Sequence, residues 1–143
     1  MALDPAVFQG LSGFRYALRR FLAASETICR ASGLTSQQYQ VLLAIKAGEG
    51  TDMSIRHLAD QLLLTHHAAV QMIDRLETDG LAVRRSSDQD RRVALLSLTE
   101  KGQTLVERLA RKHLNEMLRQ APLLRVSLDR LSHIDGETSG HIG

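Results

Sequence analysis

A cluster of four arginines falls within nine residues of this chain, at Arg84, Arg85, Arg91 and Arg92. Two carboxylates, Asp88 and Asp90, lie between them, so the segment keeps a net charge of +2. Guanidinium groups stay charged at any working pH and bind phosphate oxygens through paired hydrogen bonds. The whole chain of 143 residues has a formal charge of only +2. A partner that is selected by charge would therefore have to bind a local patch of charged residues. This cluster therefore suits a polyanion.

A β-hairpin is the element that would present these arginines. The runs LAVRRS (81–86) and VALLSL (93–98) are rich in strand-forming residues, and SSDQD between them consists of turn formers. We therefore predict a hairpin whose tip, residues 84–92, carries the arginines.

Two short helices are predicted immediately before the hairpin. Ser54 can cap a short helix, and Thr65 can cap a second one that runs over residues 65–79. The second helix would bury apolar residues and leave a polar stripe outside, at His67, Gln71, Asp74, Arg75 and Thr78. A short helix, a turn and a second helix with a polar outer face form a helix-turn-helix.

Longer helices flank this region. After Pro5 an apolar seam repeats at spacings of three and four, and Thr35 with Gln38 forms a capping box for the next helix. A further helix begins after Thr99, and we expect Pro122 to interrupt it before a last helix. The prediction is a mainly α protein with about six helices and a short β-hairpin.

Three segments make the sequence resemble the MarR (multiple-antibiotic-resistance regulator) family of bacterial winged helix-turn-helix transcription factors. They are LTSQQYQVLLAI, LADQLLLTHHAAVQMIDRLETDGLAVRR and DQDRRVALLSLTEKG. The resemblance implies one domain over 1–143, with dimerisation helices at 5–32 and 100–135 and a DNA-binding lobe at 35–99. It also implies a homodimeric, ligand-responsive repressor of a pseudo-palindromic operator in double-stranded DNA. The apolar stripe after Pro122 (Leu124, Leu128, Leu131 and Ile134) agrees with a partner chain.

The resemblance places the helix that begins at Thr65 in the major groove and Arg92 in the minor groove. The expected DNA-binding residues are Ser54, Arg56, Thr65, His66, His67, Gln71, Arg75, Arg84, Arg85, Arg91 and Arg92. Asp74 and Asp90 would repel phosphate, so we expect each to orient an arginine, with Arg75 as one candidate partner of Asp90.

The family's usual effector, a small anionic aromatic compound, is the expected ligand, and no cofactor is expected. Arg15 and Arg19 stand one helical turn apart and could hold a carboxylate. Tyr39 could supply an aromatic wall. Solvated surface charge is the plainer explanation of the two arginines.

Other classes of function receive less support from the sequence. Metal binding is not expected, because His57, His66 and His67 lack the convergent spacing of a zinc site. The chain has none of the common nucleotide-binding or hydrolase motifs of enzymes. Two alternatives stay open. One is a winged-helix module that docks protein without binding DNA, and the other is a redox-responsive regulator that senses through Cys29. We expect Cys29 to be half-buried at an interface.

The expected location is cytoplasmic. One cysteine cannot form an intrachain disulfide, and the first ten residues lack the pattern of an export signal. No run of apolar residues is long enough to span a bilayer, so no membrane role is expected.

Overall fold

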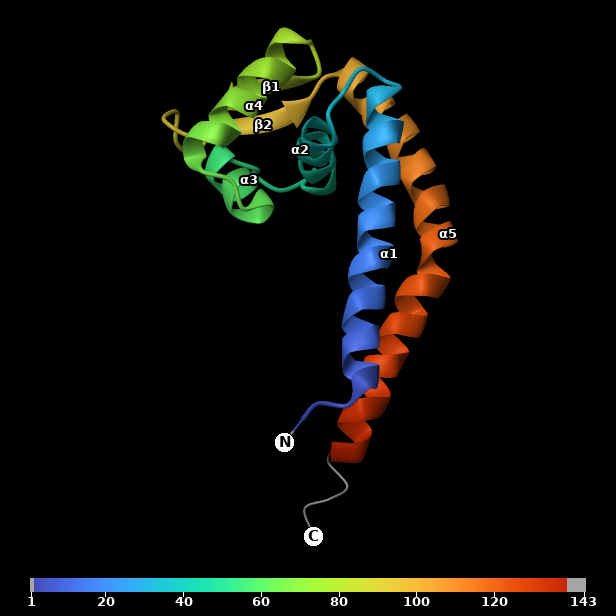
Figure 1. Cartoon of the computed structure of the whole chain (residues 1–143). Helices are drawn as coiled ribbons and strands as arrows, with labels where there is room; N and C mark the ends of the chain where they lie inside the picture. The colour runs from blue at the N-terminus through green and yellow to red at the C-terminus, as the bar shows by residue number, and fades with distance from the viewer. Residues whose placement is uncertain (1, 139–143) are drawn as a thin grey trace. The chain divides into compact units, whose positions relative to one another are not determined.

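The structure, a computed structural model, describes residues 2–138, with side chains described up to residue 132. Its elements are α1 (Pro5–Arg30), α2 (Ser36–Ala47), α3 (Ile55–Leu62), α4 (His66–Thr78), β1 (Ala82–Ser86), β2 (Ala94–Leu98) and α5 (Glu100–Thr138) (Figure 1). β1 and β2 pair antiparallel, with Arg84 opposite Leu96. The predicted mainly helical fold with a hairpin wing is confirmed.

Residues 28–111 form one compact unit, which we call the lobe. Its core is made of side chains from α2, α3 and α4, such as Leu42, Leu58 and Ile73, each of them fully buried. The end of α1 and the first turns of α5 add Cys29 and Leu109 to the same core. This compact unit contains the whole of the segment 35–99 and extends beyond it at both ends.

Short polar side chains start the helices of the lobe. Thr35 and Gln38 form the predicted capping box, with N–H to oxygen distances of 2.9 and 3.1 Å. Ser54 accepts the N–H of His57 at 3.2 Å, and Thr65 accepts the N–H of Ala68 at 3.1 Å. Each cap satisfies a backbone donor that the helix leaves unpaired, so the three predicted starts are confirmed.

Thr99 and Gly102 join the start of α5 to the end of α4. Thr99 Oγ1 donates to the carbonyl of Gly80 at 2.7 Å and accepts the N–H of Gly102 at 3.0 Å. A Cβ atom on Gly102 would lie 2.0 Å from the carbonyl oxygen of Leu81. The backbones thus approach closely, and this contact explains why glycine ends the segment LTEKG.

The second compact unit, which we call the two-helix unit, joins α1 up to residue 27 to α5 from residue 112 onward. The helices run antiparallel and close together, since a Cβ on Gly10 would meet Leu131 at 2.9 Å and one on Gly13 would meet Ser127 at 3.0 Å. Their buried side chains are small or polar: Ala17, Ser25, His113, Gln120 and Ser127.

The large apolar side chains of the two-helix unit stay exposed instead. Phe8, Leu22 and Leu118 are 59%, 51% and 66% exposed. Phe14 and Phe21, seven residues apart on α1, are partly buried. The side chain of Ile134 lies outside the described ones.

One expectation about the helices is wrong. α5 continues through Pro122, so the described residues hold five helices and not about six. Proline removes a single backbone hydrogen bond and crowds the carbonyl four residues earlier. The segments before and after it both contact α1, through His113 on one side and Ser127 on the other, and this packing keeps one helix continuous.

Candidate nucleic-acid interface

The outer stripe of α4 has the predicted composition. His67, Gln71 and Arg75 are exposed at spacings of four, while Ala69 and Ile73 on the opposite face are fully buried. This is the period of an α-helix that lies half in the core. Thr65 and His66 are exposed at its start. The helix therefore presents hydrogen-bonding side chains along one open face.

Three separate segments meet at a hollow of about 350 Å³ beside the start of α4. The start of α3 contributes Ser54 and Arg56, α4 contributes His66, and the hairpin contributes Arg92. Ile55, Val93 and Ala94 complete the lining. The structure thus brings together four of the residues expected to bind DNA. Two guanidinium groups at one hollow favour an anionic partner.

Arg84 lies elsewhere, with its guanidinium on the carboxylates of α4. Its Nη2 is 2.6 Å from Asp74 Oδ1, and its Nη1 is 3.0 Å from Glu77 Oε2. The backbone N–H of Arg84 also donates to Glu77 Oε1 at 3.0 Å. Glu77 therefore holds both the strand and its side chain, and these contacts together fix β1 against α4. We call this group the wing clamp.

The wing clamp changes the role of Arg84. Partial burial, the largest single effect on its pKa, lowers it, but the hydrogen bonds and charges of Asp74 and Glu77 together outweigh burial and raise the pKa above its ordinary value. The side chain is 26% exposed. An arginine with two carboxylate partners is occupied, so we assign Arg84 to positioning the hairpin and no longer to phosphate contact.

Asp90 shapes the tip of the hairpin. Its Oδ1 accepts the backbone N–H of Arg92 at 3.0 Å and the side-chain Nε of Arg92 at 3.3 Å. Ser87, which is buried, accepts the N–H groups of Gln89 and Asp90 at 3.2 and 3.4 Å. These short-range bonds define a turn in which Arg92 projects outward with its side chain 93% exposed.

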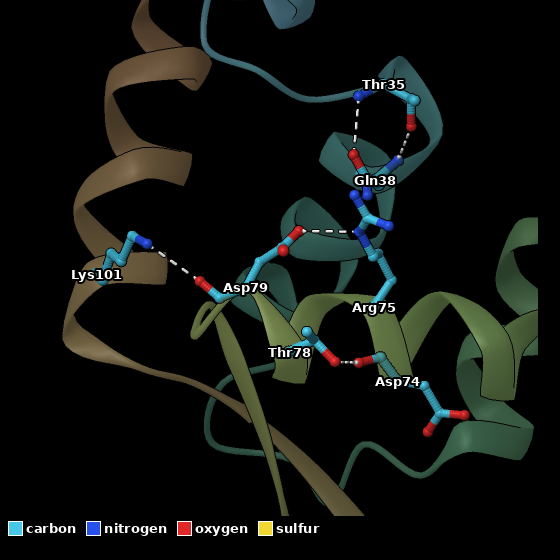
Figure 2. Close-up of polar contacts among 7 residues, drawn as sticks. All are labelled: Thr35, Gln38, Asp74, Arg75, Thr78, Asp79 and Lys101. Atoms are coloured by element: carbon cyan, nitrogen blue, oxygen red, sulfur yellow. Dashed lines mark hydrogen bonds and ion pairs between the residues drawn. The ribbon is translucent and has the colours of Figure 1, made fainter.

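Arg75 has a different partner from the one considered for Asp90. Its Nε lies 3.4 Å from Asp79 Oδ2, at the end of the same helix, and Figure 2 shows the two side chains directed at each other. Nearby, Lys101 Nζ donates to the carbonyl of Asp79 at 3.1 Å and ties α5 to the end of α4. The Arg75 side chain is 69% exposed, so a weak surface pair leaves it accessible.

The remaining two arginines of the cluster lie apart from the hollow beside α4. Arg85 lines a different hollow, of about 200 Å³, together with Glu49 and Gln103. Arg91 is exposed at the hairpin tip. The cluster that looks uniform in sequence therefore divides into one clamp residue and three accessible cations.

The residues expected to hold a small ligand are divided between the two compact units. Arg19 lines a hollow of about 590 Å³ in the two-helix unit, together with Phe8 and Tyr16. Arg15 is exposed on the same helix. Tyr39 belongs to the lobe, where it is 5% exposed and packs in the core. Burial, and to a smaller extent the charge of Cys29, raises the pKa of Tyr39.

Cys29 is fully buried in the core of the lobe, and not half-buried as expected. It lies near the end of α1 and packs within the buried cluster of the lobe, which also includes Tyr39. A redox-sensing thiol needs access to its oxidant and stabilisation of its thiolate. The geometry is that of a packing residue.

Two further properties concern metals and membranes. The residues that the structure describes contain no group of three His, Cys, Asp or Glu side chains placed to hold a metal ion. Among the same residues, no helix has the length and apolar character required to cross a membrane.

Two residues of this region, Glu77 and Ser87, were not among those predicted from the sequence. Glu77 follows Asp74 by three residues, so both lie on one side of α4, and this spacing was the available signal. Ser87 stands in the SSDQD turn, where a serine hydroxyl often accepts backbone N–H groups.

The chain is similar in sequence to known transcriptional regulators. The protein-family model described as MarR family matches residues 32–93 of the sequence. The organic hydroperoxide resistance transcriptional regulator of Bacillus subtilis (strain 168) is 35% identical over 75 residues, which cover 52% of this chain and 50% of that protein. The match therefore spans half the length of that relative. The homoprotocatechuate degradative operon repressor of Escherichia coli is 28% identical over 109 residues, 75% of this chain and 72% of that protein.

A solved structure extends the likeness to most of the fold. The transcriptional repressor CouR, bound to a 23-mer DNA duplex, superposes with a TM-score of 0.69 and 28% identity over 87% of this chain and 88% of that chain. CouR from Rhodococcus jostii RHA1 has also been solved bound to p-coumaroyl-CoA, with 27% identity, a TM-score of 0.64 and coverage of 70% and 69%.

Proposed function

We propose that this chain is a MarR-family protein and that it acts as a homodimeric transcriptional repressor, which binds a pseudo-palindromic operator in double-stranded DNA. The observation that carries the proposal is the hollow where Arg56, His66 and Arg92 meet from three segments. Its relatives are regulators and not enzymes, and we assign no catalytic activity. A cytoplasmic location, beside bacterial DNA, follows from this role.

α4 enters the major groove in this proposal. Its exposed His67, Gln71 and Arg75 offer donors and acceptors to base edges, and Thr65 with His66 faces the DNA at the helix start. Arg92 enters the adjacent minor groove, where a narrow A·T-rich tract has strongly negative potential. Ser54, Arg56, Arg85 and Arg91 contact the phosphate backbone.

The two-helix unit forms the dimer interface in this proposal. Its buried seam is small or polar, while its large apolar side chains, among them Phe8 and Leu118, are exposed. A monomer arranged in this way would leave its best hydrophobic surface in water, which is unfavourable by about 25 cal/mol per Å² of apolar area. A second copy that covers this surface recovers that free energy.

A small anionic aromatic effector would release the operator. Relatives whose names connect them to aromatic compounds, the homoprotocatechuate operon repressor and CouR, support this class of ligand. Arg19, beside Phe8 and Tyr16, and its neighbour Arg15 are the residues that we propose for its carboxylate. The assembly uses no metal or cofactor.

A salt-dependent duplex binding assay tests the proposed function. Log affinity should fall linearly with log salt. Replacing both Arg56 and Arg92 by alanine removes four contacts from the dimer and should make the slope shallower by about 3.6, or about 0.9 per lost contact. A matched control removes two exposed arginines of α5, Arg111 and Arg119, and should leave the slope unchanged. Equal effects of the two double variants, or no duplex binding by the natural protein, would favour the protein-docking alternative.

Light scattering tests the dimer separately. The natural protein should have about twice the 15.9 kDa mass of one chain. Leu118→Glu places a charge in the proposed interface and should shift the protein towards monomer or unfolded chain. Leu43→Glu, at an exposed leucine of the lobe, is the control and should stay dimeric.

A further inference from the structure

Leu63 occupies an unusual backbone conformation in the turn between α3 and α4. Its φ of 54° and ψ of 41° are left-handed, and it is the one residue other than glycine with positive φ in the described part of the chain. The N–H of Leu64 donates to the carbonyl of Ala59 at 2.9 Å, which closes the last turn of α3. Glycine usually fills this position, as Gly80 does after α4.

The fold gains nothing from a leucine side chain at this position. A Cβ atom in the left-handed region crowds the following carbonyl, so glycine would be less strained. The Leu63 side chain is also 93% exposed, whereas the neighbouring Leu62 and Leu64 are partly buried. The residue therefore combines backbone strain with an apolar group left in water, and neither favours the isolated protein.

The position of Leu63 in the helix-turn-helix indicates what covers it. It lies two residues before Thr65, the N-cap of α4, and three residues before His66. His66 lines the hollow of about 350 Å³ that also contains Arg56 and Arg92. In helix-turn-helix proteins the first residues of the second helix are those that reach base edges. Leu63 is thus an exposed apolar group in the turn that leads into the start of α4, the part of that helix that would be closest to the bases.

We propose that Leu63 is a specificity-determining residue whose side chain contacts the C5-methyl group of a thymine in the major groove of the operator half-site. This inference rests on the proposed function, since it requires α4 to enter duplex DNA. The thymine methyl is the apolar group that base pairs display in the major groove, where the other recognition features are hydrogen-bond donors and acceptors. Strain at Leu63 is then retained because it places this contact.

Deoxyuridine substitution tests the contact directly, because deoxyuridine lacks only the methyl group of thymidine. An operator is first selected from random duplexes with the purified full-length protein, and each thymidine of one half-site is then replaced in turn. At one position the natural protein should lose about fourfold in affinity, the change expected for one unburied methyl group. Leu63→Gly and Leu63→Gln should bind the natural operator more weakly and should bind the substituted and unsubstituted duplexes equally.

Matched variants separate this contact from general damage. Leu43→Gln makes the same chemical change at an exposed leucine of α2 and should keep the methyl dependence. Leu63→Gly should unfold at the same temperature as the natural protein or higher, because glycine relieves the left-handed strain.

Three outcomes overturn the inference while leaving the proposed function intact: no position sensitive to loss of the methyl, methyl sensitivity that persists in Leu63→Gly, or undiminished operator binding by Leu63→Gly. Failure of the natural protein to bind any duplex in a salt-dependent manner would instead defeat the proposed function itself.

Discussion

Replacing Arg84 by alanine should destabilise the lobe without removing a DNA phosphate contact. The guanidinium group lies 2.6 Å from Asp74 and 3.0 Å from Glu77, and the Arg84 side chain is 26% exposed. Its neighbour Arg85 is exposed on the same strand and lines a different hollow. The two adjacent arginines should therefore behave differently when each is replaced.

The size of the effect follows from the exposure of the partners. Fully exposed ion pairs contribute about 0.2 to 1 kcal/mol, and breaking a fully buried pair costs about 3 to 5 kcal/mol. Asp74 is 60% exposed and Glu77 33%, so both pairs lie near the exposed end of this range. We expect Arg84→Ala to lower the free energy of unfolding by about 1 to 2 kcal/mol and Arg85→Ala by less than about 0.5 kcal/mol.

Urea unfolding at one fixed protein concentration measures this difference, since a dimer's stability depends on concentration. A double-mutant cycle between Arg84→Ala and Asp74→Ala should show coupling that decreases at high salt. The slope of log affinity against log salt should stay unchanged for Arg84→Ala and become shallower by about 1.8 for Arg92→Ala, which removes one contact of about 0.9 from each subunit of the dimer. Unchanged stability together with a reduced slope would show that Arg84 contacts phosphate and that the wing clamp does not position the hairpin.

Three further predictions concern the hairpin tip, the start of α5 and the end of α2. Asp90→Ala should weaken operator binding, whereas Asp90→Asn, which keeps an acceptor for the N–H of Arg92, should bind as well as the natural protein or better; weaker binding by both variants in a gel shift would contradict the turn role. Gly102→Ala should destabilise the lobe by about 2 kcal/mol or more in urea unfolding, because its Cβ would lie 2.0 Å from the carbonyl oxygen of Leu81. Glu49 has a lowered pKa, chiefly through its hydrogen bond from Gln103 and then through Lys46, so its contribution to stability is present above the ordinary carboxyl pKa and is lost as pH falls through the lower folded value. The stability difference between the natural protein and Glu49→Gln should therefore shrink below about pH 4.5, and a difference that persists there would contradict this linkage.

Much of the lobe could be predicted because its signals are local. Thr35, Ser54 and Thr65 each accept a backbone N–H three residues ahead, so the start of each helix is set by a few neighbouring residues. The buried and exposed positions of α4 follow from its 3.6-residue period in the same way. Such features require no knowledge of what the rest of the chain does.

Features that depend on distant packing were harder to predict. The interruption expected at Pro122 is a local argument, and contacts of α5 with α1 on both sides of the proline outweigh it. The burial of Tyr39 and Cys29 depends on which face of each helix meets the lobe core. Residue type alone left both as candidates for ligand or redox chemistry.

The arginine cluster shows why charge counting over a sequence misassigns roles within a site. Asp74 and Asp90 would each be expected to repel DNA, yet one holds Arg84 against α4 and the other holds the backbone and side chain of Arg92. The Arg84 side chain is 26% exposed beside Asp74, whereas the Arg92 side chain stays 93% exposed beside Asp90. The acidic residues therefore act as geometric constraints on the hairpin. A variant such as Asp90→Ala, which removes the accepting oxygen together with the charge, should lose affinity through misplacement even as its net charge becomes more favourable for binding a polyanion.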